Sequence, residues 1–132
     1  MAETQSKTHV KRVGRVVIVV ADQDKAIDFY VDKLGFEKRA DVPFGNGDRW
    51  VEVAPPGGVT SIALMPPMGG DSPGKQTGVV LDSDDLDADH AELKARGVDV
   101  DADIMRGPDI PPMFWFRDQD GNTLLMVTAG EA

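Results

Sequence analysis

The sequence predicts an α+β protein in which two βαβββ modules form a curled mixed sheet around a cleft. The first observation is a repeat: residues 16–36 and residues 78–98 each run from a β-branched strand through aspartates and a helical segment to a glycine and an apolar residue. The second is that short strand patterns bounded by turn residues follow each copy. The third is that the pattern occurs only twice, whereas a solenoid needs three or more repeats to bury its faces. Two modules that meet at a pseudo-twofold axis form a cleft, where function is expected.

The first module begins with a strand over residues 16–20, whose continuous apolarity predicts burial on both faces. Asp22 is the expected N-cap of a helix over residues 24–34, which carries an apolar stripe at helical spacing. Gly35 then supplies the left-handed residue that ends the helix. The remaining strands are expected at residues 36–41, 49–53 and 60–65, with turns at residues 45–48 and 55–58.

The second module repeats this order after a glycine- and proline-rich connection over residues 66–76. The expected elements are a strand at 78–81, a helix at 86–96, strands at 98–104, 113–117 and 123–128, a loop at 106–112 and a turn at 118–121. Asp120-Gly121 in that turn is a strong hairpin signal. We expect a single domain over residues 10–129, with modules at about 10–66 and 77–129 and a flexible tail over residues 1–9.

Composition excludes several classes of protein. The 132-residue chain has no cysteine, so neither disulfides nor thiolate chemistry are expected, which fits a cytoplasmic location. It has no apolar run of about 18 residues, so no membrane span is expected. Its net charge of −9 argues against nucleic acid as a partner.

Two segments resemble the vicinal oxygen chelate superfamily, which includes glyoxalases, bleomycin resistance proteins and extradiol dioxygenases. The pattern D-x-x-x-A-x-x-F-Y-x-x-x-L-G-F is met by Asp22, Ala26, Phe29, Tyr30, Leu34, Gly35 and Phe36. Residues 116–127 resemble the closing hairpin of that superfamily, with Gln119 in place of the usual proline. The resemblance implies paired βαβββ modules around a cleft, and it implies a homodimer.

Metal-using members of that superfamily hold the ion with up to four histidine or glutamate side chains on cleft-lining strands. The positions that match these ligands here are Arg15, Ala63, Gly78 and Leu125. None of these side chains can bind a metal in the expected way. Of the two histidines, we expect His9 to be solvent-exposed and His90 to be partly buried on the sheet-facing side of the second helix. We therefore predict no metal and no other cofactor.

Strand alternation predicts which side chains face the cleft. The predicted ligand-binding residues are Arg15, Trp50, Glu52, Ala63, Met65, Met113, Trp115, Arg117 and Leu125. An apolar cleft with two tryptophans suits a flat organic molecule, although either tryptophan can instead fill the core. Arg15 and Arg117 can neutralise an anionic or phenolic group on the ligand, and Arg15 can instead form an internal salt bridge to Glu52.

Two functions follow from these residues. The first is a metal-independent protein that binds or sequesters a small hydrophobic or aromatic compound, such as an antibiotic or secondary metabolite. The alternative is a glyoxalase-, epimerase- or dioxygenase-like enzyme, which normally relies on a metal ion to stabilise charge. A metal-free enzyme with Glu52 as general base and Arg15 as oxyanion partner is also open. We favour binding over catalysis and assign no catalytic residue.

Overall fold

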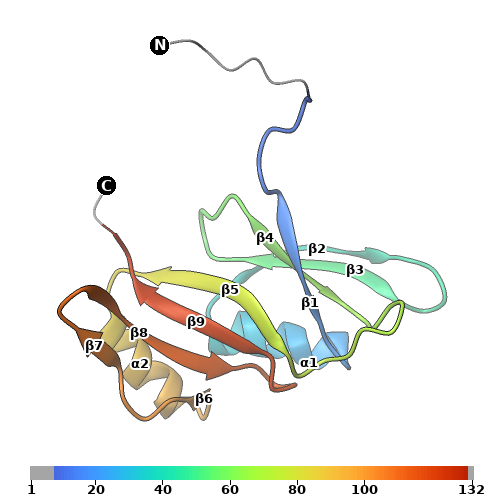
Figure 1. Cartoon of the computed structure of the whole chain (residues 1–132). Coiled ribbons are helices and arrows are strands. Elements are labelled where there is room, and N and C mark those ends of the chain that lie inside the picture. The colour runs from blue at the N-terminus through green and yellow to red at the C-terminus, as the bar shows by residue number, and fades with distance from the viewer. Residues whose placement is uncertain (1–7, 131–132) are drawn as a thin grey trace.

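The computed structural model describes residues 8–130 and confirms the α+β class with two modules (Figure 1). Residues 1–7 of the predicted tail lie outside the described residues, and Thr8 and His9 are exposed. Among the described residues, no helix has both the length and the apolarity that crossing a bilayer requires.

The first module forms a four-stranded mixed sheet in the order β1-β4-β3-β2. Its elements are β1 (Arg15–Val19), α1 (Gln23–Ile27), the π-helical turn η1 (Asp28–Lys33), β2 (Glu37–Pro43), β3 (Arg49–Ala54) and β4 (Ser61–Met65). β1 runs parallel to β4, and the other pairs are antiparallel. These elements match the expected strands to within one or two residues.

The second module repeats this topology in the order β5-β9-β8-β6, with β7 added beside β8. Its elements are β5 (Gln76–Ser83), α2 (Leu86–Ala95), β6 (Asp99–Val100), β7 (Met105–Gly107), β8 (Ile110–Arg117) and β9 (Thr123–Thr128). β5 runs parallel to β9, as β1 does to β4.

The helix of the first module differs from the sequence prediction in its second half. Asp22 caps α1 as expected, because its side chain accepts a hydrogen bond from the Lys25 backbone N–H at 3.1 Å. From Asp28 onward the helix widens to a π-turn, in which the Leu34 N–H donates to the Phe29 carbonyl. Gly35 then ends it with φ of 79°, as expected.

Two predictions in the second module are wrong. The strand expected at 98–104 is shorter and consists of β6 alone. The Asp101 N–H still donates to the Trp115 carbonyl, but the aspartate-rich residues after it leave the sheet. The loop expected at 106–112 is instead a hairpin of β7 and β8, closed where Gly107 pairs with Ile110. Pro111 and Pro112 are tolerated in β8 for two reasons. They precede Met113, where the pairing of β8 with β9 begins, and they lie opposite the shift in register between Met105 and Gly107 of β7.

Both helices cover one face of the strands, so each sheet has a buried face and an open face (Figure 1). The buried faces share one core, whose fully buried members include Ile18, Val51, Leu64, Phe114 and Leu124. Burial of these apolar side chains is the main favourable term in folding. The buried Tyr30 links the modules through its hydroxyl, which donates to Asp118 Oδ2 at 2.8 Å.

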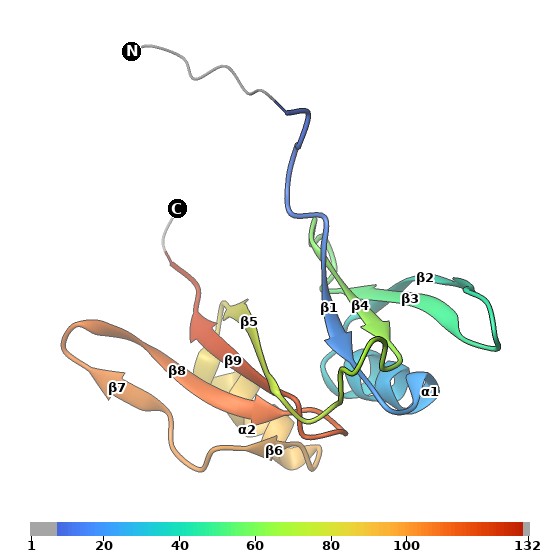
Figure 2. The same cartoon turned by 45° about the vertical axis from the view of Figure 1, so that its right-hand side comes forward.

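The strands form two sheets, and β1 and β5 stand at the edges where the modules meet. Figure 2 shows these two edge strands converging near the end of β1 and separating away from it. At the convergence, Asn122 Nδ2 donates to the Val19 carbonyl at 2.9 Å and to Asp118 Oδ2 at 2.9 Å. The junction is therefore fixed at one end and open at the other.

Candidate functional site

The predicted site residues lie on the strand faces that point away from the helices. In β1 the core-facing Ile18 is buried, whereas its neighbour Val17 is 53% exposed. In β8 the core-facing Phe114 and Phe116 are buried, and Trp115 between them is half-buried. The alternation expected from the sequence is thus confirmed in β1 and β8, and the predicted residues on these two strands occupy the open faces of the sheets.

Glu52 organises the open face of the first sheet. Its Oε2 accepts a hydrogen bond from Trp50 Nε1 at 2.6 Å and another from Arg15 Nε at 3.0 Å. The Glu52 side chain is only 14% exposed, whereas that of Arg15 is 52% exposed. The internal salt bridge weighed for Arg15 is therefore present, and it uses only one of the guanidinium nitrogens.

The Trp50 ring lies in an apolar part of this face. Its ring centroid is 5.4 Å from that of Phe44 in an edge-to-face arrangement. Phe44 is 46% exposed, and Val42, which pairs with Trp50 across the strands, is 51% exposed. Sequence reasoning missed both residues, although the alternation of β2, continued to the phenylalanine before the glycine turn, could have identified them.

Ion pairs on the opposite face hold the start of β3 in place. Arg49 contacts Asp41 on β2 at 2.9 Å and Asp24 on α1 at 2.9 Å. Its backbone N–H and carbonyl are both hydrogen-bonded by the Gln23 amide. The hydrogen bond from Arg49 lowers the pKa of Asp41 below its usual value, and the carboxylates raise the pKa of Arg49. These contacts hold Arg49 in place, so β3 is fixed directly before Trp50.

The open face of the second sheet carries the other predicted residues. Trp115 lies opposite Leu125, and Met113 lies opposite Val127. Arg117 is already paired, because its guanidinium contacts Asp101 at 2.6 Å and Asp99 at 3.6 Å. Arg15 thus has more donors to offer a ligand than Arg117 has.

Two predicted residues are less accessible than expected. Ala63 and Met65 lie on the open side of β4, opposite Val17 and Val19 of β1, yet both are fully buried. Larger neighbours such as Glu52, which pairs directly with Ala63, account for the burial of this alanine. A ligand on this face would contact the larger side chains before it reached Ala63.

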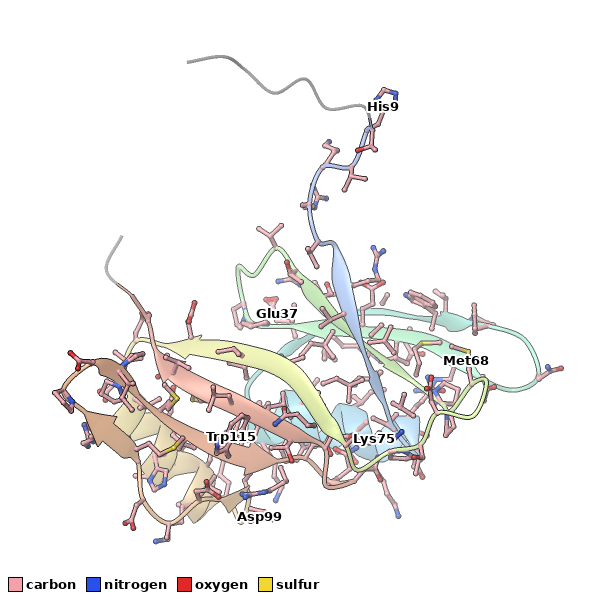
Figure 3. The ribbon with its side chains drawn as sticks, in the orientation of Figure 1. His9, Glu37, Met68, Lys75, Asp99 and Trp115 are labelled. Atoms are coloured by element: carbon pink, nitrogen blue, oxygen red, sulfur yellow. The ribbon has the colours of Figure 1, made fainter. Side chains whose placement is uncertain are left out.

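The nine predicted residues form two separate groups within one chain. Figure 3 places Trp115 on the second sheet, away from β2 and β3 of the first module. A cavity of about 750 Å³ lies between the modules, and none of the nine residues lines it. Its lining is mainly apolar and includes Val16, Leu34, Ile62, Val79, Leu81 and Met126.

The two helix C-termini close this cavity on the helix side. Lys33 Nζ donates to the Arg96 carbonyl at 2.7 Å, and Arg96 Nη1 donates to the Lys33 carbonyl at 2.9 Å. Each cation therefore caps the carbonyl end of the opposite helix, where positive charge is favourable. Sequence reasoning did not identify this pair.

The histidines match their predicted environments. His9 is exposed, and His90 is half-buried, with its ring 4.8 Å from that of Phe114 and its Nε2 2.7 Å from the Asp101 carbonyl oxygen. Over residues 8–130, no three histidine, cysteine or acidic side chains are grouped closely enough to hold a metal ion.

The chain is similar in sequence to known proteins. The family model described as the glyoxalase/bleomycin resistance protein/dioxygenase superfamily matches residues 12–126. The chain is 32% identical to the uncharacterized protein YetH of Bacillus subtilis (strain 168), over 89% of this chain and 98% of that protein.

Solved structures extend the comparison. The chain is similar to TnmS3, an antibiotic binding protein from Streptomyces sp. CB03234, at 37% identity and a TM-score of 0.82, over 93% of this chain and 99% of that one. A superfamily member from Sphaerobacter thermophilus DSM 20745 is also 37% identical, with a TM-score of 0.86, over 92% of this chain and all of that one.

Proposed function

Because this chain belongs to the glyoxalase/bleomycin resistance protein/dioxygenase superfamily, we propose that it binds a small hydrophobic or aromatic compound and sequesters it without chemical change. The observation that carries this proposal is the fixed, half-buried indole of Trp50 on an open apolar face. The likeness to an antibiotic binding protein supports the same class of function.

The geometry around Trp50 favours a planar ligand. The indole N–H is already bonded to Glu52, so the ring offers its apolar surface rather than a donor. Phe44 and Val42 extend that surface. Stacking on an aromatic side chain contributes about 0.5–1.5 kcal/mol beyond the burial of apolar area.

The charges on this face favour an anionic or phenolic oxygen on the ligand. Arg15 uses its Nε for Glu52, and the described residues provide no hydrogen bond or ion pair to its two terminal nitrogens. A guanidinium offers several donors in a fixed fork, so these nitrogens can donate hydrogen bonds to an oxygen of the ligand while the salt bridge persists.

Binding is proposed to be independent of metal. The positions that correspond to metal ligands hold Arg15, Ala63, Gly78 and Leu125, none of which donates an electron pair from its side chain to a cation. Glu52, the acidic residue beside them, is engaged by two donors.

We propose that the groove is closed between two copies of the chain. Within one chain the Trp50 face and the Trp115 face lie on different sheets, and both are open to solvent. A second copy that sets its Trp115 face against the Trp50 face would enclose a ligand between two tryptophans. This supports a homodimer with two equivalent grooves.

Tryptophan fluorescence tests the proposal directly, because Trp50 and Trp115 are the two tryptophans of the chain. We expect saturable quenching by planar aromatic compounds that carry a phenol or carboxylate. Trp50→Ala should weaken binding about tenfold or more, which corresponds to about 1.4 kcal/mol. Lys94→Ala, an exposed change on α2, is the control and should leave affinity unchanged.

Two results would contradict the proposal. A flat response to every planar compound, in both fluorescence and calorimetry, would remove ligand sequestration. Stoichiometric nickel, zinc, iron or manganese in the purified protein would favour the alternative of a glyoxalase- or dioxygenase-like enzyme.

A further inference from the structure

The cavity of about 750 Å³ between the modules is separate from the open faces that carry the tryptophans. It lies where β1 and β5 separate (Figure 2), and it is lined by both strands. Val16 of β1 and Val79 and Leu81 of β5 line it and also pack against the core, so it opens on the helix side of the sheets. Its volume falls in the range of about 300–1,000 Å³ that small-molecule sites occupy.

The walls of this cavity suit an alkyl chain. Phe36 is the one aromatic residue that lines it, and the other apolar side chains are aliphatic or belong to prolines. Such walls offer little surface for stacking a flat ring. Val16, Leu34 and Val79 are only half-buried, because one side of each faces the cavity. Water beside these side chains finds few hydrogen-bond partners, so its displacement by an apolar group is favourable.

Two cations stand at one end of the cavity, where the helices of the two modules end. Lys33 Nζ donates to the Arg96 carbonyl at 2.7 Å, and Arg96 Nη1 donates to the Lys33 carbonyl at 2.9 Å. The charge of Arg96 is paired, because its Nε lies 2.8 Å from Glu92 Oε2. Within residues 8–130, no carboxylate lies at ion-pair distance from Lys33. One positive charge at this end therefore lacks a counter-charge.

The remaining acidic residues of the lining lie away from this end. Asp89 precedes Arg96 by two turns of α2, a rise of roughly 10 Å. Its carboxylate already accepts a hydrogen bond from the Ser83 hydroxyl at 2.6 Å. Asp82 is exposed and alternates along β5 with the more buried Leu81 and Ser83, so its side chain lies on the face turned away from the core. The basic end is thus free to receive an anion.

We propose that this cavity is a second binding site, which takes an alkyl carboxylate with its chain between the modules and its carboxylate held by Lys33 and Arg96. An ammonium has three donors, and Lys33 uses one of them for the Arg96 carbonyl. Arg96 Nη2 has no hydrogen bond to any residue that the structure describes. Both groups can therefore donate to one carboxylate while the contacts between the helix ends persist, and such charge-assisted hydrogen bonds are the strong ones.

Equilibrium dialysis with radiolabelled decanoate, below the concentration at which it forms micelles, tests the site. We expect saturable binding of one decanoate per chain. Lys33→Gln removes the charge and should weaken binding at least tenfold. Lys25→Gln is the matched control, because Lys25 is an exposed lysine of α1 that does not line the cavity, and it should leave binding unchanged. Equal binding by the Lys33→Gln chain would overturn the proposal, as would tighter binding of decyltrimethylammonium than of decanoate.

A second variant tests the place of the alkyl chain. Val79→Phe puts a larger side chain into the cavity and should abolish decanoate binding. Undiminished binding by a folded Val79→Phe chain, as judged by its melting temperature, would overturn the proposal. If this variant does not fold, Lys33→Gln and its control still decide the matter.

Tryptophan fluorescence separates this inference from the proposed function, because neither Trp50 nor Trp115 lines the cavity. Lys33→Gln should keep the quenching by planar aromatic compounds while it loses decanoate. Quenching without any saturable binding of decanoate would overturn this second site alone. Binding of decanoate without quenching would support the second site and contradict the proposed function.

Discussion

Removing one hydroxyl at the junction between the modules should measurably destabilise the protein. In Tyr30→Phe the ring remains in the core, but Asp118 loses the hydrogen bond that it accepts at 2.8 Å. Asp118 is buried and keeps three other donors, the backbone N–H groups of Asp120 and Asn122 and the Asn122 amide. A hydrogen bond to a charged group contributes about 1.5–3 kcal/mol to stability.

This loss can be converted into a change in melting temperature. For a chain of 132 residues, an unfolding entropy of about 2.1 cal/mol/K per residue makes 1 kcal/mol equivalent to roughly 3–4 °C. Tyr30→Phe should therefore lower the melting temperature by roughly 5–10 °C in calorimetry at neutral pH. A loss of less than about 0.5 kcal/mol would refute the view that this hydrogen bond stabilises the junction.

The same residue gives a test at alkaline pH. Burial raises the pKa of Tyr30 well above 10.0, and the neighbouring Asp118 carboxylate raises it further. Because the folded-state value is the higher one, this contribution to stability is fully present below pH 10 and is lost as the pH rises towards the folded-state value. Tyr30 is the single tyrosine of the chain, so phenolate absorbance near 295 nm reports it alone. We expect phenolate to appear only with unfolding, and phenolate in a native protein at pH 10 would contradict the argument.

Three further changes are expected to follow from local geometry. Gly35→Ala should cost about 1–2 kcal/mol in urea unfolding, because φ is 79° and an added Cβ meets no atom within 4 Å, so that only backbone strain is introduced. Asp85→Ala should cost about 1 kcal/mol, because Asp85 caps α2 by accepting from the Ala88 N–H at 3.1 Å, whereas Asp84→Ala should be nearly neutral and serves as its control. Asp41→Asn should reduce the loss of stability on acidification. Because the pKa of Asp41 is lowered in the folded state, the contribution of this carboxylate to stability is present above pH 3.8 and is lost as the pH falls through the folded-state value. Acid unfolding curves that coincide for the variant and the unmodified chain would contradict this.

The repeated module and the alternation of side chains along the strands could be predicted from the sequence because both depend on patterns over a few neighbouring residues. Three local signals in the first module each specify a conformation over a few residues: the β-branched run of the first strand, Asp22 as the N-cap of the helix, and Gly35 at the end of the helix. The π-turn at Asp28–Lys33 was not readable, since its residues carry an ordinary helical pattern. The hairpin at residues 105–112 was missed because its prolines suggest a loop unless the pairing of the neighbouring strand is known.

The candidate site divides in the same way. Alternation placed Trp50, Glu52 and Trp115 on the open faces, and the contact of Arg15 with Glu52 was one of two arrangements considered. The sequence does not show that Phe44 lies beside Trp50, or that Arg117 is already paired with Asp101. These contacts join residues on different strands, and strand register rather than local pattern decides them.

The sequence by itself determined the order of elements in the first module, the helix ends and the alternation of side chains along β1, β3, β8 and β9, because periodicity and capping act over a few residues. Only the tertiary structure decided that the strands divide into two sheets, that the two tryptophan faces of one chain do not meet, and that β1 and β5 remain as free edges beside a cavity. The angle between modules is set by contacts between residues far apart in the chain, such as Tyr30 with Asp118 and Lys33 with Arg96. Such contacts depend on how the whole molecule packs, and a short segment of the sequence does not specify them.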